Sequence, residues 1–190
     1  MGPRALVAVS DGTEEIEAVG VVDVLRRAQV EVVVARVPAA GAVDPVITAS
    51  RGVRLVSDRP LAACLDGTWD AVVLPGGMPG AEHLRDSPEL IALLRRQDGA
   101  GRLVAAICAA PAVVLAHHGL LRGRQATCFP SLRHQLPVES RNDARVVVDG
   151  NLVTSQGPGT ALEFAVTLVG LLCGRDKRDE IAGQLLLDRR

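Results

Sequence analysis

The fold is decided by residues 103–117, which read LVAAICAAPAVVLAH. The first five residues form an uninterrupted apolar run, which is typical of a strand covered on both faces of a parallel sheet. Pro111 suits the first turn of a helix, because the N–H group that proline lacks would have no partner there. The stretch predicts a strand over residues 103–107, a sharp turn at Cys108 and a helix over residues 111–117.

The same alternation extends along the rest of the chain. Apolar, β-branched runs predict further strands at residues 5–9, 30–37, 71–74, 145–148 and 152–154. Helical spacing predicts helices at residues 14–28, 88–98 and 160–173, and a weaker one at residues 177–187. Within residues 38–60, two short runs around Gly52 predict a small inserted hairpin. We therefore expect an α/β sandwich, with a mostly parallel sheet and helices on both faces, in a single domain over residues 1–190.

The composition excludes several classes of function. The 190 residues include 21 basic and 22 acidic side chains, so no positive charge is in excess to bind a phosphate backbone. Aromatic residues make up only 2% of the chain, which leaves almost none to stack on bases. The longest apolar run, residues 103–116, is interrupted by Pro111 and is shorter than the ~20 residues that span a bilayer. We expect neither nucleic acid nor a membrane as a partner.

Cysteine spacing and the N-terminal residues indicate the compartment. The apolar run at residues 5–9 is too short for the core of a signal peptide, so we expect the cytoplasm, where thiols stay reduced. The four cysteines lie at least 20 residues apart, without a C-x-x-C motif or a nearby histidine pattern. They predict separate thiols, and neither a disulfide framework nor a metal site is expected.

Cys108 is the candidate nucleophile. Chemistry in parallel α/β sheets takes place at the carboxyl ends of the strands. We therefore expect one rim of the sheet to hold residues 10–12, 75–80, 108–110 and 155–159. A thiol between a strand and a helix is exposed at that rim, where the helix N-terminus is expected to lower its pKa. The alternative is a buried, inert thiol. That alternative is favoured for Cys64 and Cys173, whereas a role as second redox thiol stays open for Cys128.

The helix predicted at residues 14–28 begins in an acidic cluster. We expect Asp11 or Thr13 to cap its first turn. At 100° per residue, Glu15 projects toward the polar side of the helix, while Glu14 lies on a stripe of apolar residues. Capping alone would explain Glu14, so its role in a site stays open.

Glu17 lies deeper in the same helix, on a stripe with Val21 and Val24. An isolated buried charge is costly, so either a core arginine compensates Glu17 or the residue takes part in chemistry. If Glu17 reaches Cys108, burial and the neighbouring thiolate both raise its pKa. The pair then shares one negative charge, and Glu17 serves as a general acid and base.

Two glycine-rich loops follow predicted strands. Gly76 and Gly77 form a tight turn whose N–H groups, together with that of Ala109, suit an oxyanion hole. The loop at residues 157–159 precedes a helix, but a dinucleotide motif would need a third glycine where Leu162 stands. No phosphate-binding lysine follows either loop. Tight-turn geometry explains both loops, and no cofactor is expected.

These motifs resemble those of the ThiJ/PfpI family, which includes the Parkinson's-disease protein deglycase. The matching stretches occur in the family's order at residues 4–9, 11–17, 72–77, 80–82, 105–111 and 154–160. The chain looks closest to the bacterial YajL-type members. The resemblance implies a flavodoxin-like fold of the class I glutamine-amidotransferase type, and a homodimer.

The resemblance also implies roles for the residues of the site. Cys108 is then a reactive, peroxide-sensitive nucleophile, and Glu17 is its protonated partner. The N–H groups of Gly77 and Ala109 surround a bound oxygen.

Further residues would shape the pocket. Glu14 and Arg51 match positions that shape the pocket at the dimer interface, and Gly76 is expected among the residues around the pocket. The family's activities are cofactor-free hydration of glyoxals to hydroxy acids, repair of early glycation adducts and redox-regulated chaperoning.

At two positions this sequence lacks a histidine that other family members carry, which argues against a histidine-assisted reaction here. In the protease-like branch a histidine follows the nucleophile, whereas Ala109 stands here. Phe129 precedes Pro130 where many eukaryotic members carry a site histidine. No predicted strand ends at a histidine; the histidines are His83, His117, His118 and His134. We therefore expect a site that works without histidine.

Three functions are compatible with this chemistry. The first is a cofactor-independent, cysteine-dependent glyoxalase or protein deglycase, which acts on methylglyoxal, other small aldehydes or glycated proteins during oxidative and carbonyl stress. The second is a redox-sensing chaperone (holdase) controlled by oxidation of Cys108. The third is a peptidase or amidase, which the missing histidine makes the weakest hypothesis.

Overall fold

The predicted strands form one central sheet. The structure is a computed structural model that describes residues 2–39 and 44–187. Within these residues, a seven-stranded sheet has the order β5-β2-β1-β6-β7-β9-β8. The bounds are Arg4–Val9 (β1), Glu31–Arg36 (β2), Arg59–Pro60 (β5), Ala71–Leu74 (β6), Leu103–Ile107 (β7), Val146–Asp149 (β8) and Leu152–Ser155 (β9). Neighbouring strands are parallel except β8 and β9, which confirms the expected mostly parallel sheet.

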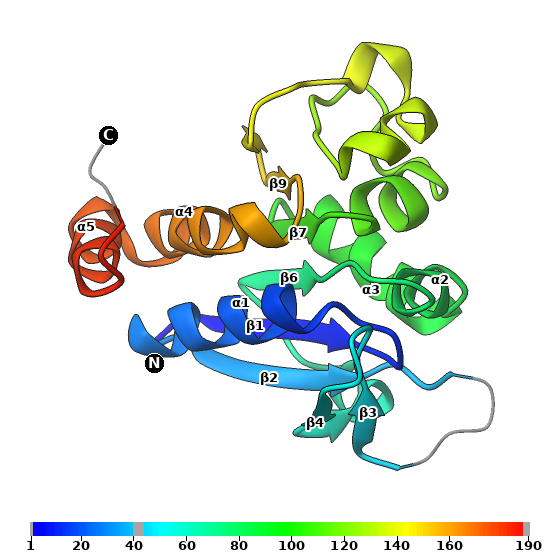
Figure 1. The fold of residues 1–190 in the computed structure, drawn as a ribbon, viewed down its shortest axis with the longest axis horizontal. Helices are drawn as coiled ribbons and strands as arrows, with labels where there is room; N and C mark the ends of the chain where they lie inside the picture. The colour runs from blue at the N-terminus through cyan, green and yellow to red at the C-terminus, as the bar shows by residue number, and fades with distance from the viewer. Residues whose placement is uncertain (1, 40–43, 188–190) are drawn as a thin grey trace.

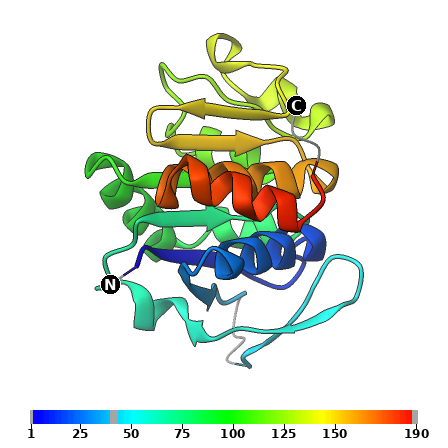
Figure 2. The same cartoon turned by 90° about the vertical axis from the view of Figure 1, so that its left-hand side faces the viewer.

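Helices cover both faces of this sheet, as expected (Figure 1). Figure 2 shows α1 (Glu15–Arg27), α4 (Ala161–Cys173) and α5 (Arg175–Gln184) in front of the strands. The opposite face carries α2 (Gly80–Arg85), α3 (Pro88–Gly99) and η2 (Pro111–Ala116). Short 3-10 turns are Leu61–Cys64 (η1), Pro130–Gln135 (η3), Val138–Ser140 (η4) and Pro158–Thr160 (η5). Among the described residues, no helix is long and apolar enough to cross a lipid bilayer.

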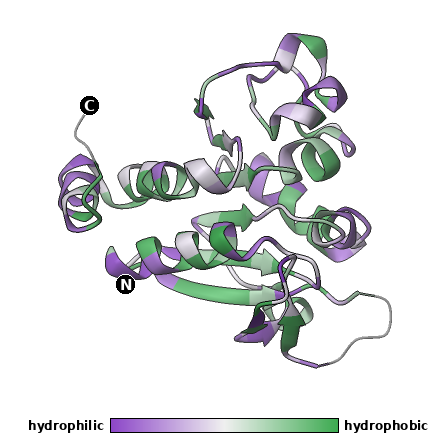
Figure 3. Cartoon of the chain, viewed as in Figure 1, coloured by the Kyte–Doolittle hydropathy of each residue, from purple (hydrophilic) through white to green (hydrophobic). Residues whose placement is uncertain are grey.

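Two apolar cores form because successive residues of a strand point to opposite faces of the sheet. In β1, Leu6 and Ala8 pack with the core under α2 and α3, whereas Val7 packs with the core under α1 and α4. Figure 3 shows the resulting concentration of hydrophobic residues in the strands and of polar residues on the outer helices. Both faces of the central strands are therefore buried, which explains their near-continuous apolar sequences.

The predicted elements are present, and the structure adds several short ones. The expected hairpin is the antiparallel pair β3 (Val46–Thr48) and β4 (Arg54–Val56). The helix expected at residues 111–117 is a π-helical segment, η2. Sequence patterns miss β5, because it has two residues and one is proline, and miss α2, because it has six residues and begins with glycine.

An ion pair between a buried arginine and a half-buried aspartate connects the hairpin to the loop after β1. Arg36, at the end of β2, is buried and pairs with Asp11 Oδ2 over 2.9 Å. Asp11 Oδ1 accepts a hydrogen bond from Thr48 N–H over 2.8 Å, and the Arg36 guanidinium also donates to the carbonyl groups of Asp44 and Val46. The β3–β4 hairpin is therefore held beside the loop that leads into α1.

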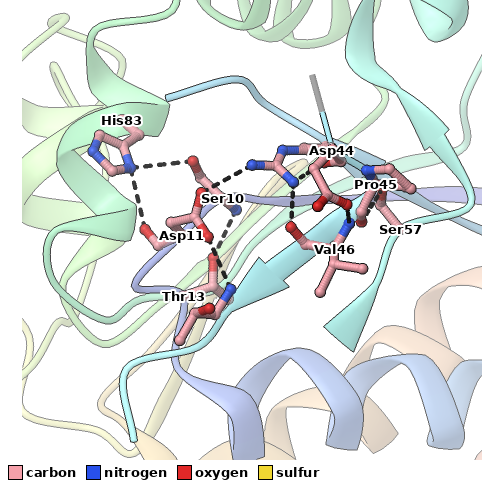
Figure 4. Close-up of polar contacts among 10 residues, drawn as sticks. Ser10, Asp11, Thr13, Asp44, Pro45, Val46, Ser57 and His83 are labelled. Carbon is pink, nitrogen blue, oxygen red and sulfur yellow. Dashed lines mark hydrogen bonds and ion pairs between the residues drawn. The ribbon is translucent and has the colours of Figure 1, made fainter. Parts of the chain in front are cut away.

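A histidine holds the other side of this loop. Figure 4 shows the loop residues Ser10, Asp11 and Thr13 next to His83 on α2. His83 Nδ1 lies 3.1 Å from Ser10 Oγ and 3.1 Å from the carbonyl oxygen of Asp11. The loop is thus fixed between α2 and the β3–β4 hairpin before it enters α1.

Candidate active site

Cys108 occupies the turn between β7 and η2. Its φ of +63° lies in the left-handed region, which residues other than glycine rarely adopt. Two hydrogen bonds hold the turn: Cys108 N–H donates to Ser155 O over 2.9 Å, and Cys108 O accepts from Phe129 N–H over 2.8 Å. Strain of this kind persists when the surrounding structure enforces it, and it is concentrated at functional sites.

Glu14 caps α1 and thereby positions Glu17. Glu14 Oε2 accepts a hydrogen bond from Glu17 N–H over 2.8 Å, and Glu14 N–H donates to Gly76 O over 2.9 Å. The expectation that Asp11 or Thr13 caps the helix is wrong, because both side chains are engaged elsewhere in the loop and hairpin. The cap therefore joins α1 directly to the loop after β6.

Glu17 is fully buried, with 0% of its surface exposed, beside Cys108. Glu17 Oε2 accepts a hydrogen bond from Gly76 N–H over 2.7 Å, and the carboxyl group lies close to the Cys108 side chain on the other side of Gly76. Glu17 Oε1 makes no hydrogen bond of good geometry with any described residue. A backbone N–H group, and not a core arginine, is therefore the hydrogen-bond partner of the buried carboxyl, and the Cys108 thiol is its neighbour.

Burial controls the protonation of this pair. Burial raises the pKa of Glu17 to about 7, although the Gly76 N–H group and the Cys108 thiol oppose the shift. Burial, followed by the charge and hydrogen bond of Glu17, also raises the pKa of Cys108, while the N–H groups of Ala109 and Gly77 lower it. The expected net lowering of the Cys108 pKa by the helix terminus is therefore wrong. Because each group opposes ionisation of the other, the pair carries a single negative charge above about pH 7.

Two glycines allow the backbone to approach the thiol. A Cβ atom at Gly76 would lie 2.7 Å from Cys108 Cβ and 3.0 Å from Glu17 Oε2, so a side chain there would separate the pair. Gly77 adopts a φ of +88°, and its N–H group faces the Cys108 sulfur together with that of Ala109. The N–H groups predicted for an oxyanion hole therefore converge on the sulfur atom.

The hairpin fixes the remaining acidic residue of the cluster. Glu15 is 8% exposed and accepts hydrogen bonds from Ser50 Oγ over 2.8 Å and from Arg51 N–H over 2.9 Å. The side of α1 toward which Glu15 projects is covered by the β3–β4 hairpin, so the carboxylate meets polar groups of the hairpin and not solvent. The Arg51 side chain itself is exposed, and among the described residues its guanidinium donates only to Ser50 O. The structure therefore places Arg51 next to the N-terminus of α1, without contact to the Cys108–Glu17 pair.

The other thiols differ from Cys108 in their surroundings. Cys64 and Cys128 are buried in the core under α2 and α3, and Cys173 is half-buried on α4. Burial raises the pKa of Cys128 to about 11, and its thiol donates to Phe129 O over 3.4 Å. These features favour structural roles for the three thiols.

The structure adds Gly157 to the surroundings of Cys108. Sequence reasoning assigns this glycine to a tight turn alone. A Cβ atom at Gly157 would lie 3.9 Å from Cys108 Sγ and 3.3 Å from Phe129 Cδ2. The sequence does place Gly157 in the loop at residues 155–159, which is expected at the same rim as Cys108. It does not predict that the Phe129 ring packs against Gly157.

A flavodoxin-like sheet with a strained cysteine after a central strand defines a class of α/β proteins whose site lies at the rim. The chain belongs to the DJ-1/PfpI family: the sequence model of that family matches residues 3–171. This result confirms the family expected from the motifs.

Known relatives agree with this assignment. Protein DJ-1 homolog B of Arabidopsis thaliana is 47% identical over 175 residues, which cover 92% of this chain and 39% of the relative. The chain thus spans about two fifths of that relative's length. Glutathione-independent glyoxalase DJR-1.2 of Caenorhabditis elegans is 35% identical over 179 residues, covering 93% of this chain and 92% of the relative. The solved structure of oxidized Toxoplasma gondii DJ-1 has 45% identity and a TM-score of 0.93, covering 97% and 98% of the two chains.

Replacement of Glu17 should change how stability depends on pH. The folded protein holds the Glu17 proton up to about pH 7, whereas an unfolded chain releases it near 4.5, so the free energy of unfolding falls as the pH rises through this window. We expect the wild type to lose about 3 kcal/mol across the window relative to Glu17→Gln. Urea unfolding over a series of pH values measures the difference.

A matched control is Glu139→Gln, which removes an exposed carboxylate in η4. This variant should keep the pH dependence of the wild type. If the wild type and Glu17→Gln instead show parallel pH profiles, Glu17 is not protonated in the folded protein.

Proposed function

We propose that the protein is a cofactor-independent glyoxalase with Cys108 as its nucleophile, and that it also acts as a deglycase on early glycation adducts. The observation that carries this proposal is the placement of the buried Glu17 carboxyl beside Cys108, across Gly76, at a turn where two N–H groups face the sulfur. The name of the Caenorhabditis elegans relative, a glutathione-independent glyoxalase, supports the same reaction. The reaction needs no cofactor, because the thiol supplies the nucleophile and the carboxyl group carries the proton.

The first step is addition of the Cys108 sulfur to the aldehyde carbon. When the shared proton sits on Glu17, the sulfur is a thiolate; it forms a bond to carbon while the C=O π electrons move to oxygen. The N–H groups of Ala109 and Gly77 stabilise this oxyanion. Glu17 then protonates the oxygen, which yields a hemithioacetal.

In the second step Glu17 moves a proton between two carbon atoms. Its carboxylate removes the proton from the former aldehyde carbon, which gives an enediolate, and it returns a proton to the adjacent carbon. The former aldehyde carbon is oxidised to a thioester while the adjacent carbonyl carbon is reduced to an alcohol, so electrons are conserved within the substrate. Water hydrolyses the thioester and releases lactate from methylglyoxal or glycolate from glyoxal.

Early glycation adducts extend the same chemistry to proteins. In such an adduct, the aldehyde carbon is already bonded to a thiol, amine or guanidinium group. Reversal of that addition frees the aldehyde, and attack by Cys108 then follows the steps above. The proposal therefore covers both free small aldehydes and glycated proteins.

Substitutions at the pair should separate nucleophile from proton carrier. Cys108→Ser should abolish the loss of methylglyoxal, because a serine hydroxyl is far less ionised than a thiol. Glu17→Gln should lower kcat by about 10²- to 10⁴-fold, because the proton carrier is lost. The assay follows methylglyoxal loss and lactate formation. Cys173→Ser, at a half-buried thiol on α4, should retain the wild-type rate, and a wild-type protein that forms no lactate would exclude this reaction.

A redox sensor with holdase activity is a second candidate function. One solved relative is oxidized Toxoplasma gondii DJ-1, and here the Glu17 carboxyl lies beside Cys108 while two N–H groups face the sulfur that oxidation would modify. Two molecules of peroxide each transfer one oxygen atom to the sulfur and leave as water, which converts the thiol to a sulfinic acid. Glu17 and the N–H groups would then hold the sulfinate oxygens.

Peroxide treatment tests this candidate. We expect mass spectrometry to place two added oxygen atoms on Cys108, and the oxidised protein to suppress aggregation of a heat-denatured client better than untreated protein. Treated Cys108→Ser should show no such gain. Equal suppression by treated wild type and treated Cys108→Ser would contradict control by this thiol.

We also propose a homodimer formed through α1 and α4. Ile16, Val19 and Leu162 expose large apolar side chains on these helices. A Cβ atom at Gly20 would lie 3.9 Å from Leu162 Cδ2, so the exposed faces of α1 and α4 adjoin. Adjoining apolar side chains on a folded surface favour association with another apolar surface, here that of a second copy.

Val19→Lys should convert the dimer to a monomer, because it would bury a charge in the interface. Light scattering after size exclusion measures the mass. Val138→Lys, at an exposed position in η4, is the matched control and should leave the mass unchanged. A dimer that persists in Val19→Lys would place the interface elsewhere.

A further inference from the structure

A cavity of about 300 Å³ lies at the end of η2 opposite to the Cys108 turn. Four basic side chains line it: Arg95, His117, His118 and Arg122. Among the described residues that form its walls there is no aspartate or glutamate, and the other wall residues are small or apolar. The volume is at the lower end of the range for small-molecule sites. The cavity therefore has the size and charge for a small anion, and we call it the basic cavity.

The fold brings two arginines to one turn of this cavity. Arg95 comes from α3, and its Nη2 donates a hydrogen bond to His118 O over 3.1 Å. Arg122 lies against Gly119, where an added Cβ atom would be 3.4 Å from Arg122 Nε and 3.8 Å from Arg122 Cζ. The two guanidinium groups thus reach consecutive residues of the same turn. Positive charges this close repel each other, and an anion bound to both would replace that repulsion with attraction.

The surrounding protein leaves this charge uncompensated. Within residues 2–39 and 44–187, neither arginine of the basic cavity forms an ion pair with a carboxylate. Asp86, which borders the next cavity, is engaged by the Arg85 guanidinium over 2.7 and 2.9 Å. At the end of η2, Ala116 O accepts from Gly119 N–H over 3.0 Å, so a backbone group satisfies this carbonyl. The two guanidinium groups therefore remain available to a ligand.

The two histidines add further hydrogen-bonding groups. His118 Nε2 lies 2.8 Å from Arg85 O, and because a carbonyl oxygen only accepts, this nitrogen carries the hydrogen. His118 Nδ1 has no hydrogen-bond partner among the described residues. The His117 ring meets the His118 ring edge to face, with the centroids 4.8 Å apart. Two guanidinium groups and two imidazole rings therefore border one small volume.

A larger, more apolar cavity adjoins the basic cavity. Its volume is about 570 Å³, and it shares Arg95 and His118 with the basic cavity. Pro88, Ile91 and Ala92 also line it. A ligand whose anionic group lies at the two arginines can therefore place an organic group on these apolar side chains.

We propose that the basic cavity binds the phosphate group of a small phosphate monoester, whose organic part lies in the adjoining cavity. A phosphate group carries close to two negative charges and three acceptor oxygens, which suits two guanidinium groups and two imidazole rings better than a carboxylate does. The planar guanidinium also matches phosphate oxygens with two parallel hydrogen bonds. This site goes beyond the proposed reaction and uses no residue of the Cys108–Glu17 pair.

Calorimetric titration with phenyl phosphate tests the proposal. We expect saturable binding to the wild type and an affinity lower by about 10-fold or more in Arg122→Gln, because charge-assisted hydrogen bonds to phosphate are lost. Arg122 is exposed, so this variant should fold as the wild type does. The matched control is Arg175→Gln, which removes the same charge at an exposed position of α5 and should keep the wild-type affinity.

Inorganic phosphate and Cys108→Ser complete the experiment. Inorganic phosphate should bind more weakly than phenyl phosphate, because it leaves the adjoining cavity empty. Cys108→Ser should bind phenyl phosphate as the wild type does, so the result does not depend on the proposed glyoxalase activity.

Four results would overturn the proposal. The first is a wild type that does not bind phenyl phosphate, and the second is equal weakening in Arg122→Gln and Arg175→Gln, which indicates attraction by net charge alone. Inorganic phosphate that binds as tightly as phenyl phosphate would identify free phosphate as the ligand and overturn the monoester. Loss of binding in Cys108→Ser would place the ligand at the rim instead.

Discussion

The burial of a carboxyl group against a thiol is the constraint on which the rest of the site depends. Glu17 and Cys108 come from α1 and from the turn after β7, and they meet because β1, β6 and β7 are neighbours in the sheet. Parallel strands bring their following loops to one rim, so Gly76 lies between the two side chains. Two acidic groups in this position cannot both ionise at low cost, and the proton that they retain is the one that catalysis needs to move.

Most polar groups around the thiol belong to the backbone. Gly76 N–H compensates Glu17, and the N–H groups of Gly77 and Ala109 face the sulfur. Such groups are fixed by the fold and need no reorganisation when charge develops on a substrate oxygen. Function at this rim therefore depends on close approach of the main chain, which glycine and alanine permit, more than on charged side chains.

The central strands and the two residues of the pair could be singled out from the sequence, because each depends on a local pattern, whereas their pairing is implied by the family resemblance. Apolar runs indicate strands buried on both faces, and the place of Cys108 after such a run indicates a turn at the rim. Helical projection places Glu17 on the inner face of α1, since that face is a property of the helix alone.

The failures occur where distant segments decide the outcome. The β3–β4 hairpin, held through Arg36 and Asp11, covers Glu15. A helical projection of the α1 sequence cannot predict this, because the hairpin is a different segment of the chain. The pKa of Cys108 depends on burial and on Glu17, which outweigh the helix terminus. Gly157 lies near both the thiol and the Phe129 ring, and its contact with Phe129 joins two loops 28 residues apart in sequence.

The two-residue strand β5 has a consequence for the behaviour of the molecule in a crowded solution. It forms the edge of the sheet beside β2, and its residues are an exposed arginine and an exposed proline. Pro60 has no N–H group to offer to a further strand, and Arg59 places a charge at the same border. An open edge of a parallel sheet allows cross-β association between molecules. The edge strand β5 is short, carries a charged side chain and lacks one backbone N–H donor. The protein is thus protected at this edge against sheet-to-sheet aggregation, whatever happens at the rim where its chemistry takes place.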